Sequence, residues 1–315
     1  MVTETRPSRS ASRTSSKANS PSSSVTSAPA ATRDAVATAD ISEQPKSAPR
    51  PRPTTVGVVA SSGVIRVGVV GAGGRMGATV CGAVAADPQL ELVAAVDPGH
   101  VGASIHGVTV AGDLKALADA KCEVVVDFTV AAAARTTLPW LALHGMHAVV
   151  GTTGFSDDDI DGFRRAFTAS NCLIAANFAI GAVLMMKFAE QAAPYFDTAE
   201  IIELHHNAKA DAPSGTAVAT AQRMAASSSD WADDPTTHEV YPGARGGEGP
   251  AGIRIHSVRM VGMTAHQEVI LGGSGQTLTI RHDSFDRVSF MPGVVLACKK
   301  VAETSGLTLG LDAIL

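Results

Sequence analysis

The chain of 315 residues has few of the features that accompany membranes, nucleic acids or oxidising compartments. Its four cysteines, Cys81, Cys122, Cys172 and Cys298, have no CxxC spacing, which argues against a disulfide framework and against a zinc site. No apolar run reaches the roughly 18 residues that span a bilayer. The net charge of -5 gives a phosphate backbone no electrostatic reason to bind. We therefore expect a protein of a reducing compartment, the cytoplasm, that binds neither membranes nor nucleic acids.

The N-terminal 63 residues differ in composition from the rest of the chain. They are rich in Ser, Thr, Pro, Ala and Arg and poor in bulky apolar side chains, as in RPSRSASRTSSKANSPSSS. Such a segment cannot bury enough apolar surface to offset the entropy that ordering costs. We predict a disordered tail over 1–63. A transit peptide has a similar composition, and a dispensable extension is the other interpretation.

Regular structure is predicted from Ile65 onward. The β-branched run Ile65–Val70 ends in glycines, Ala-rich helical spacing follows over 74–86, and a second apolar run covers Leu90–Val96. Segments long enough for crossover helices separate three further short apolar runs, 123–129, 147–154 and 172–178. This pattern predicts an α/β fold with a Rossmann-like, doubly wound parallel sheet.

The pattern changes after about residue 180. A strand is predicted over 199–206, between two helices over 179–193 and 214–226. Period-two alternation then indicates antiparallel strands with one polar face over 252–261, 266–273 and 276–283, followed by a helix over 294–303. We predict a dinucleotide-binding domain over 64–179, completed by 289–315, and an α+β domain with an open mixed sheet over 180–288.

The loop GAGGRMG follows a predicted strand and opens a predicted helix. Its glycines, Gly71, Gly73, Gly74 and Gly77, form GxxGxxG with one addition, and Met76 occupies the sixth position of a strict GxGxxG. Small residues let the backbone approach a pyrophosphate, which free amides at a helix N-terminus attract. A tight turn without a ligand is the structural alternative. An acidic residue at the end of the second strand, about 20 residues beyond the loop, favours a dinucleotide.

Two residues bear on which dinucleotide binds. Asp97 would hydrogen-bond the ribose hydroxyls and repel a 2′-phosphate, which favours NADH. Arg75 could pair with that phosphate and favour NADPH, unless it is a solvated surface charge. We expect NADH, NADPH or both.

A second segment, ELHHNAKADAPSGTA over 203–217, concentrates polar chemistry. Lys209 supplies a positive charge and a proton, and residues 214–216 open a helix whose amides can bind a carboxylate. His205 and His206 follow a predicted strand and can act as donors. Structural histidines, a capping Ser214 and a surface lysine are the alternatives. Together these residues predict a catalytic site for a small dianion.

On these motifs the chain resembles the dihydrodipicolinate reductase family over about residues 64–315. HHNAKADAPSGTA carries most of the resemblance, and GRMG, DFT, GTTGF and NFAIG occur in the expected order. The resemblance implies NAD(P)H-dependent reduction of 4-hydroxy-tetrahydrodipicolinate in lysine and diaminopimelate biosynthesis. Hydride would pass to ring carbon C4 with loss of water. The resemblance also implies a homotetramer assembled through the sheets of the second domain.

The resemblance assigns roles to individual residues. His205 would donate or accept a proton, and Lys209 would donate one. His206, Gly215 and Thr216 would bind the dicarboxylate substrate, with Ser214 opening the same helix. The residues expected to line the cofactor are Gly71, Ala72, Gly73, Gly74, Arg75, Met76, Asp97, Gly151, Thr152, Thr153, Ala175, Ala176, Asn177 and Phe178.

The chain departs from the family pattern in three places. The loop after DFT reads VAAAA, Ala176 stands where proline is common, and the tail is absent from typical members. A different two-domain dehydrogenase remains the competing enzyme. An aspartate-semialdehyde dehydrogenase would need a nucleophilic cysteine, and Cys172 lies inside a predicted buried strand. A nucleotide-sensing protein without catalysis is the non-enzymatic alternative.

Overall fold

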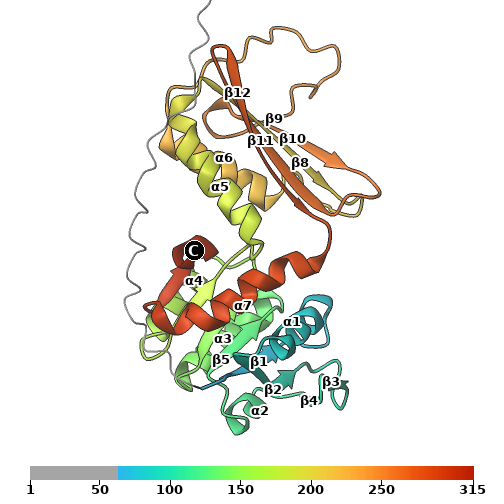
Figure 1. Cartoon of the computed structure of the whole chain (residues 1–315), viewed down its shortest axis with the longest axis vertical. Coiled ribbons are helices and arrows are strands. Elements are labelled where there is room, and N and C mark those ends of the chain that lie inside the picture. Colours follow the sequence, from blue (N-terminus) through green and yellow to red (C-terminus); the bar gives the residue numbers. More distant parts are fainter. Residues whose placement is uncertain (1–62) are drawn as a thin grey trace, which may run out of the picture. The chain divides into compact units, whose positions relative to one another are not determined.

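A computed structural model describes residues 63–315 (Figure 1). The prediction of a disordered tail concerns residues that lie outside this range, apart from Gly63. Within the described range, no helix is long and apolar enough to cross a membrane.

The first sheet has eight strands in the order β13-β7-β6-β5-β1-β2-β4-β3. All neighbours pair in parallel except β3 and β4. This confirms the predicted Rossmann-like sheet. The strands are β1 (Ile65–Val70), β2 (Leu90–Val96), β3 (Ser104–Ile105), β4 (Val108–Ala111), β5 (Val124–Asp127), β6 (His147–Val150), β7 (Cys172–Ile174) and β13 (Leu307–Leu309).

The apolar runs of this sheet are buried on both faces. Val124 and Val126 of β5 pack in one hydrophobic cluster, whereas Val125 between them packs in another. Because successive side chains of a strand point to opposite faces, the sheet has a core on each side. The helices connecting these strands are α1 (Arg75–Ala86), α2 (Lys115–Asp119), α3 (Ala131–Leu143) and α4 (Asp157–Ala166).

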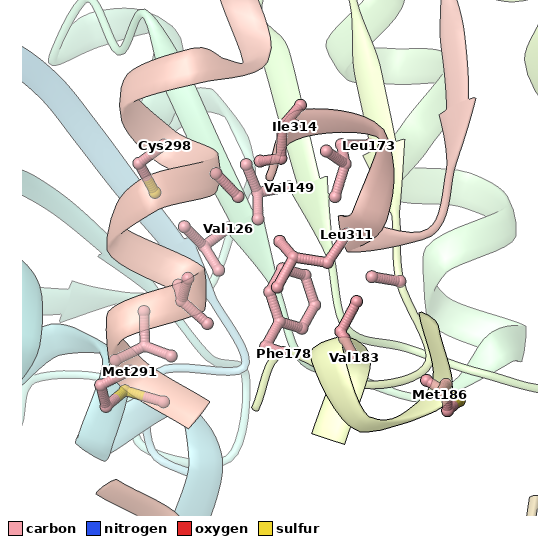
Figure 2. Close-up of a cluster of buried hydrophobic side chains, with 14 of the residues drawn as sticks. Val126, Val149, Leu173, Phe178, Val183, Met186, Met291, Cys298, Leu311 and Ile314 are labelled. Carbon is pink, nitrogen blue, oxygen red and sulfur yellow. The ribbon is translucent and has the colours of Figure 1, made fainter. Parts of the chain in front are cut away.

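The C-terminal residues return to this first sheet. Figure 2 shows side chains of α7 (Met291–Lys300) and of the 3-10 helix η5 (Leu311–Ile314) packed with Val126 and Val149 of the strands. Lys299 of α7 also donates a hydrogen bond to Asp87, 2.7 Å away. The core of the first sheet therefore depends on residues at both ends of the described chain.

A second sheet has the order β12-β11-β8-β10-β9. Its strands are β8 (Thr198–His205), β9 (Gly247–Glu248), β10 (Arg254–Arg259), β11 (Ala265–Gly273) and β12 (Gln276–Ser284). The helices α5 (Ile180–Ala192) and α6 (Gly215–Ser227) pack with it, and α6 buries Ala217, Ala221 and Met224 at helical spacing. The remaining short 3-10 helices are η1 (Ala193–Tyr195), η2 (Pro250–Gly252), η3 (Arg287–Phe290) and η4 (Val301–Glu303).

The expectation of antiparallel pairing was wrong for one strand. β11 is antiparallel to β8 and β12, but β10 runs parallel to β8. After α6 the chain re-enters the sheet as β9, which is antiparallel to β10, and the turn through η2 then reverses the chain, so that β10 runs parallel to β8. The result is a mixed sheet, as predicted for the domain as a whole.

Three predicted strands of the first sheet were too long, and four short strands were not predicted. β5 ends at Asp127, β6 at Val150 and β7 at Ile174, so residues 128–129, 151–154 and 175–178 form loops at the carboxyl end of the sheet. The strands β3, β4, β9 and β13 have two to four residues each, too few for a periodic pattern to appear.

Replacing Gly293 by alanine should destabilise the protein. A Cβ at this position of α7 would lie 2.0 Å from the backbone oxygen of Phe178. We expect the free energy of unfolding to fall by about 1–3 kcal/mol, because α7 must move away from the loop that carries Phe178. The control is Gly162→Ala in α4, where a Cβ meets nothing within 4 Å and alanine should stabilise by up to about 1 kcal/mol. Urea unfolding measures the stability of both variants. Equal changes in the two free energies of unfolding would contradict the close packing of α7 at Gly293.

Candidate functional site

The loop between β1 and α1 needs glycine at two positions. Gly71 has a φ of +79°, and a Cβ there would lie 2.9 Å from the backbone oxygen of Phe128. A Cβ on Gly77 would lie 2.0 Å from the oxygen of Gly71. The helix thus packs directly on the strand end, as a dinucleotide-binding loop requires.

The N-terminus of α1 is open to an anion. Its N-cap residue, Gly74, makes no side-chain cap, and the first turn holds no acidic residue. The first amides of the helix therefore lack the partners that a capping side chain would supply. Arg75 at the first helical position is exposed beside them.

Asp97 follows the end of β2 and lies beside the glycine loop. Its carboxylate accepts hydrogen bonds from the amides of Gly73 and Gly99, each 2.9 Å away, and pairs with His100 at 3.1 Å. Burial raises the pKa of Asp97, but the bonds from His100, Gly99 and Gly73 outweigh it and hold the pKa below its ordinary value. Asp97 is therefore a carboxylate at neutral pH.

A cavity of about 530 Å³ lies at these strand ends. Its lining includes Gly71, Gly74, Asp97, Phe128 and Thr129. Three of these five residues belong to the predicted cofactor set. The glycine loop, the uncapped amides and the carboxylate together fit a dinucleotide.

Asp127 joins the ends of β5 and β6. This fully buried carboxylate accepts hydrogen bonds from the Thr129 amide (3.0 Å) and from the hydroxyls of Thr129 (2.7 Å) and Thr152 (2.8 Å). Burial, the largest influence, raises its pKa. Thr152 is buried in this network, whereas the next residue, Thr153, is exposed. Asp127 is the first residue of the DFT motif, but no role at the site was predicted for it.

The loop after β7 connects the two groups of predicted residues. Asn177 accepts a hydrogen bond from the Ala179 amide (2.8 Å) and donates one to the hydroxyl of Thr216 (3.3 Å). Ala176 is exposed, and Ala175 is buried. The side chain of Phe178 is only 2% exposed and lies in the core, as Figure 2 shows. Only the backbone of this residue could therefore contact a ligand.

The second predicted segment is organised around a buried carboxylate. Glu203 of β8 is 0% exposed, and both of its oxygens lie 2.8 Å from guanidinium nitrogens of Arg259. His205 Nδ1 lies 2.5 Å from Oε2 of Glu203, and the Ser214 amide donates to Oε1 at 3.2 Å. These partners come from β8, from β10 and from the N-cap of α6.

These partners determine the charge of the glutamate and the protonation of the histidine. Burial raises the pKa of Glu203, but hydrogen bonds from Arg259 and His205 help to lower it below its ordinary value. Burial also lowers the pKa of His205, and Lys209 and Arg259 reinforce this against the opposing effect of Glu203. At neutral pH the imidazole is therefore neutral. With Nδ1–H donated to Glu203, Nε2 keeps its lone pair.

Lys209 lies in the turn after β8, where its amide donates to the backbone oxygen of His206. Its ammonium is 2.7 Å and 2.9 Å from the oxygens of Asp211, and the hydrogen bond from Lys209 lowers the pKa of Asp211. Arg259 donates to the backbone oxygen of Asp211 at 2.6 Å, which fixes the same turn. His206 is exposed.

The N-terminus of α6 has amides that its capping side chain does not bind. Ser214 is the N-cap, and its hydroxyl accepts a hydrogen bond from the Ala217 amide at 3.2 Å. That bond uses the third amide of the helix and leaves those of Gly215 and Thr216, with no acidic residue in the first turn. Such a terminus attracts a carboxylate.

The structure brings His205 and Ser214 to Glu203 and Arg259, which were not predicted, and Lys209 joins them through Asp211. One indication of Glu203 was present in the sequence. It lies two residues before His205 in an alternating strand, so the two side chains share a face, and a charge on a buried face requires a partner. Among the described residues, no group of three His, Cys, Asp or Glu could hold a metal ion.

Comparisons with known proteins cover almost all of the described chain. Two family models match, dihydrodipicolinate reductase N-terminus over residues 65–178 and dihydrodipicolinate reductase C-terminus over residues 181–315. A 4-hydroxy-tetrahydrodipicolinate reductase of Nocardia farcinica is 49% identical over 258 residues, which is 80% of this chain and 98% of the relative. One of Mycolicibacterium vanbaalenii is 48% identical, covering 80% and 99%.

A solved structure agrees with these relatives. The dipicolinate-bound dihydrodipicolinate reductase from Paenisporosarcina sp. TG-14 superposes with a TM-score of 0.74 at 40% identity. The match covers 80% of this chain and all of that one.

The four cysteines should be unreactive in the folded protein. All are buried, and burial raises the pKa of Cys81 and Cys122 to about 11, that of Cys298 to about 12, and that of Cys172 as well. Since the thiolate is the nucleophile, an aromatic disulfide reagent at pH 8 should modify no thiol in buffer and four in urea. Rapid modification of Cys172 in the folded protein would contradict this burial and would favour a cysteine-dependent dehydrogenase.

Proposed function

Because the chain belongs to the dihydrodipicolinate reductase family, we propose that it reduces 4-hydroxy-tetrahydrodipicolinate with NADH or NADPH. Membership makes it an oxidoreductase of lysine and diaminopimelate biosynthesis with an NAD(P)-binding Rossmann fold. The observation that supports this substrate is the juxtaposition of open α6 amides, a lysine and a neutral histidine held by Glu203.

The proposed substrate carries two carboxylates, and the segment after β8 offers a place for each charge. One carboxylate would accept hydrogen bonds from the amides of Gly215 and Thr216, which Ser214 leaves free by capping the third amide. Lys209 and the exposed His206 supply positive charge and a further donor. A dianion of small size is the ligand that this arrangement favours.

The cofactor would occupy the cavity at the carboxyl ends of β1, β2 and β5. The amides of Arg75 and Met76 would face the pyrophosphate, and Asp97 would bind the ribose. Residues 151–153 and 175–178 would line the nicotinamide side. The nicotinamide, when bound, supplies the hydride. Asp97 favours NADH and Arg75 favours NADPH, so we infer that both are used.

Lys209 and His205, which ends β8, would transfer the protons. Reduction takes up one hydride and one proton and releases the ring hydroxyl as water. Hydride addition at C4 of a conjugated imine moves electrons toward C3 and the ring nitrogen, and the Lys209 ammonium would donate the compensating proton. His205 holds its Nδ1–H toward Glu203, so its Nε2 is free to accept a proton or a hydrogen bond.

The domain boundaries and the assembly belong to the same proposal. We assign residues 64–179 and 289–315 to cofactor binding and residues 180–288 to substrate binding. Most of β12 is exposed at one edge of the second sheet, and Phe285 beyond it is 79% exposed. These surfaces favour assembly into a homotetramer through the second sheet.

A cytoplasmic location fits a biosynthetic enzyme whose four cysteines are free.

The function is tested by following absorbance at 340 nm with NADH and, separately, NADPH. The substrate is generated in situ from pyruvate and aspartate semialdehyde with the preceding synthase. The wild-type protein should oxidise the cofactor only when the substrate is formed. No oxidation by folded protein that binds NADH would refute the function.

In the same assay, Lys209→Ala should lower kcat by about 10²- to 10⁴-fold, the range for a lost general acid. The matched control is Lys115→Ala, which removes a lysine paired with a carboxylate, that of Asp119, on α2. The control should keep wild-type kcat, and both variants should bind NADH normally. A Lys209→Ala variant within about twofold of wild type would exclude Lys209 as the proton donor.

A further inference from the structure

A small cavity lies beside His205 in the second sheet. Its volume is about 40 Å³, enough for one or two groups the size of a water molecule. Side chains from β8, β11, β12, α6 and the loop before α5 line it, among them His205, Thr216, Gln267, His282, Ser284 and Asn177. The predicted roles of the family motifs do not include Gln267.

Gln267 is placed on the same face as the buried carboxylate. In the antiparallel pairing of β11 with β8, it is directly opposite Glu203, and Ala265 is opposite His205. Residues directly opposite one another share a face of the sheet. The Gln267 side chain is 4% exposed, and its Nε2 lies 2.7 Å from the hydroxyl oxygen of Thr220 on α6.

The Thr220 hydroxyl fixes the orientation of this amide. A threonine hydroxyl has a single hydrogen, and that of Thr220 is donated to the backbone oxygen of Thr216 at 2.7 Å. The Thr220 oxygen can therefore only accept from Gln267, which must present its NH₂ group there. The amide oxygen, Oε1, is then the other end of this amide group, and among the described residues it is buried with no hydrogen-bond partner.

The neighbouring groups do not supply the missing donor. His205 donates its Nδ1–H to Glu203, and in the neutral ring Nε2 is an acceptor too. Asn177 donates one amide hydrogen to the Thr216 hydroxyl. Its second amide hydrogen, and the donors of His282, Ser284 and Thr216 that also line the cavity, make no hydrogen bond to Oε1. Buried acceptors are almost always satisfied in folded proteins, so the cavity calls for a ligand group that donates a hydrogen bond. A carboxylate would be repelled, whereas a hydroxyl fits in size and polarity.

We propose that Gln267 recognises the ring hydroxyl of the substrate, which donates a hydrogen bond to Oε1 in the cavity beside His205. This inference rests on the proposed function and adds a residue to it. The two carboxylates would bind outside the cavity at Lys209 and the α6 amides, and the hydroxyl would enter it. Gln267 thereby distinguishes the hydroxylated substrate from a ring that carries the same carboxylates alone.

The test compares two ligands in Gln267→Met, a variant of similar side-chain volume without the amide. Dipicolinate has both carboxylates and no ring hydroxyl, so its Kd, measured by calorimetry with NADH present, should stay within about twofold of wild type. The kcat/KM for the hydroxylated substrate should fall about tenfold, the loss of one hydrogen bond. The control is Gln222→Met, the same substitution at an exposed position of α6, which should change neither quantity.

Each other outcome overturns the inference. If kcat/KM and dipicolinate affinity fall by the same factor, Gln267 only supports α6 through Thr220. If neither changes, the hydroxyl does not use Oε1, as when water is lost before the substrate binds. Turnover by the wild-type protein, measured in the same experiment, distinguishes failure of the proposed function from failure of the Gln267 inference. A wild type that does not turn over refutes the function and this inference, whereas turnover unchanged in Gln267→Met refutes this inference alone.

Discussion

The geometry of the site depends on one buried carboxylate. Glu203 has no exposure to solvent, and a charge in that position is strongly unfavourable unless it is paired and hydrogen-bonded. Arg259, His205 and the Ser214 amide meet that requirement from β10, β8 and the start of α6. The same bonds orient the imidazole and hold the open helix terminus, so a single desolvated charge positions the His205 ring and the free α6 amides together.

The direction of β10 is what makes this cluster possible. In the parallel pairing, Arg259 at the end of β10 is in register with His205 at the end of β8. An antiparallel β10 would place its last residue at the opposite end of β8, far from Glu203. The connection from β8 to β10 supplies the N-terminus of α6, and its reversal between β9 and β10 sets the direction that brings the guanidinium to the carboxylate.

Local patterns in the sequence predicted most of the fold and the residues close together in the chain. The Rossmann-like sheet followed from apolar runs and the glycine loop, and His205, Lys209 and Ser214 lie within ten residues of one another. What could not be predicted depends on pairing across the chain. Arg259 is 56 residues from Glu203, and Gln267 is 47 from Thr220. The partner of a single charged or amide residue in a strand cannot be inferred until the register of that strand is known.

The most direct test of this account is the kcat of Glu203→Gln, with NADH affinity and far-ultraviolet circular dichroism as checks of folding. The variant keeps the shape of the side chain but removes the charge that orients His205 and pairs with Arg259. We expect kcat to fall on the order of 10²-fold with NADH affinity unchanged. Glu268→Gln, which loses an exposed pair with Arg281 on the neighbouring strand, should keep wild-type kcat. A Glu203→Gln variant with wild-type kcat would contradict the account.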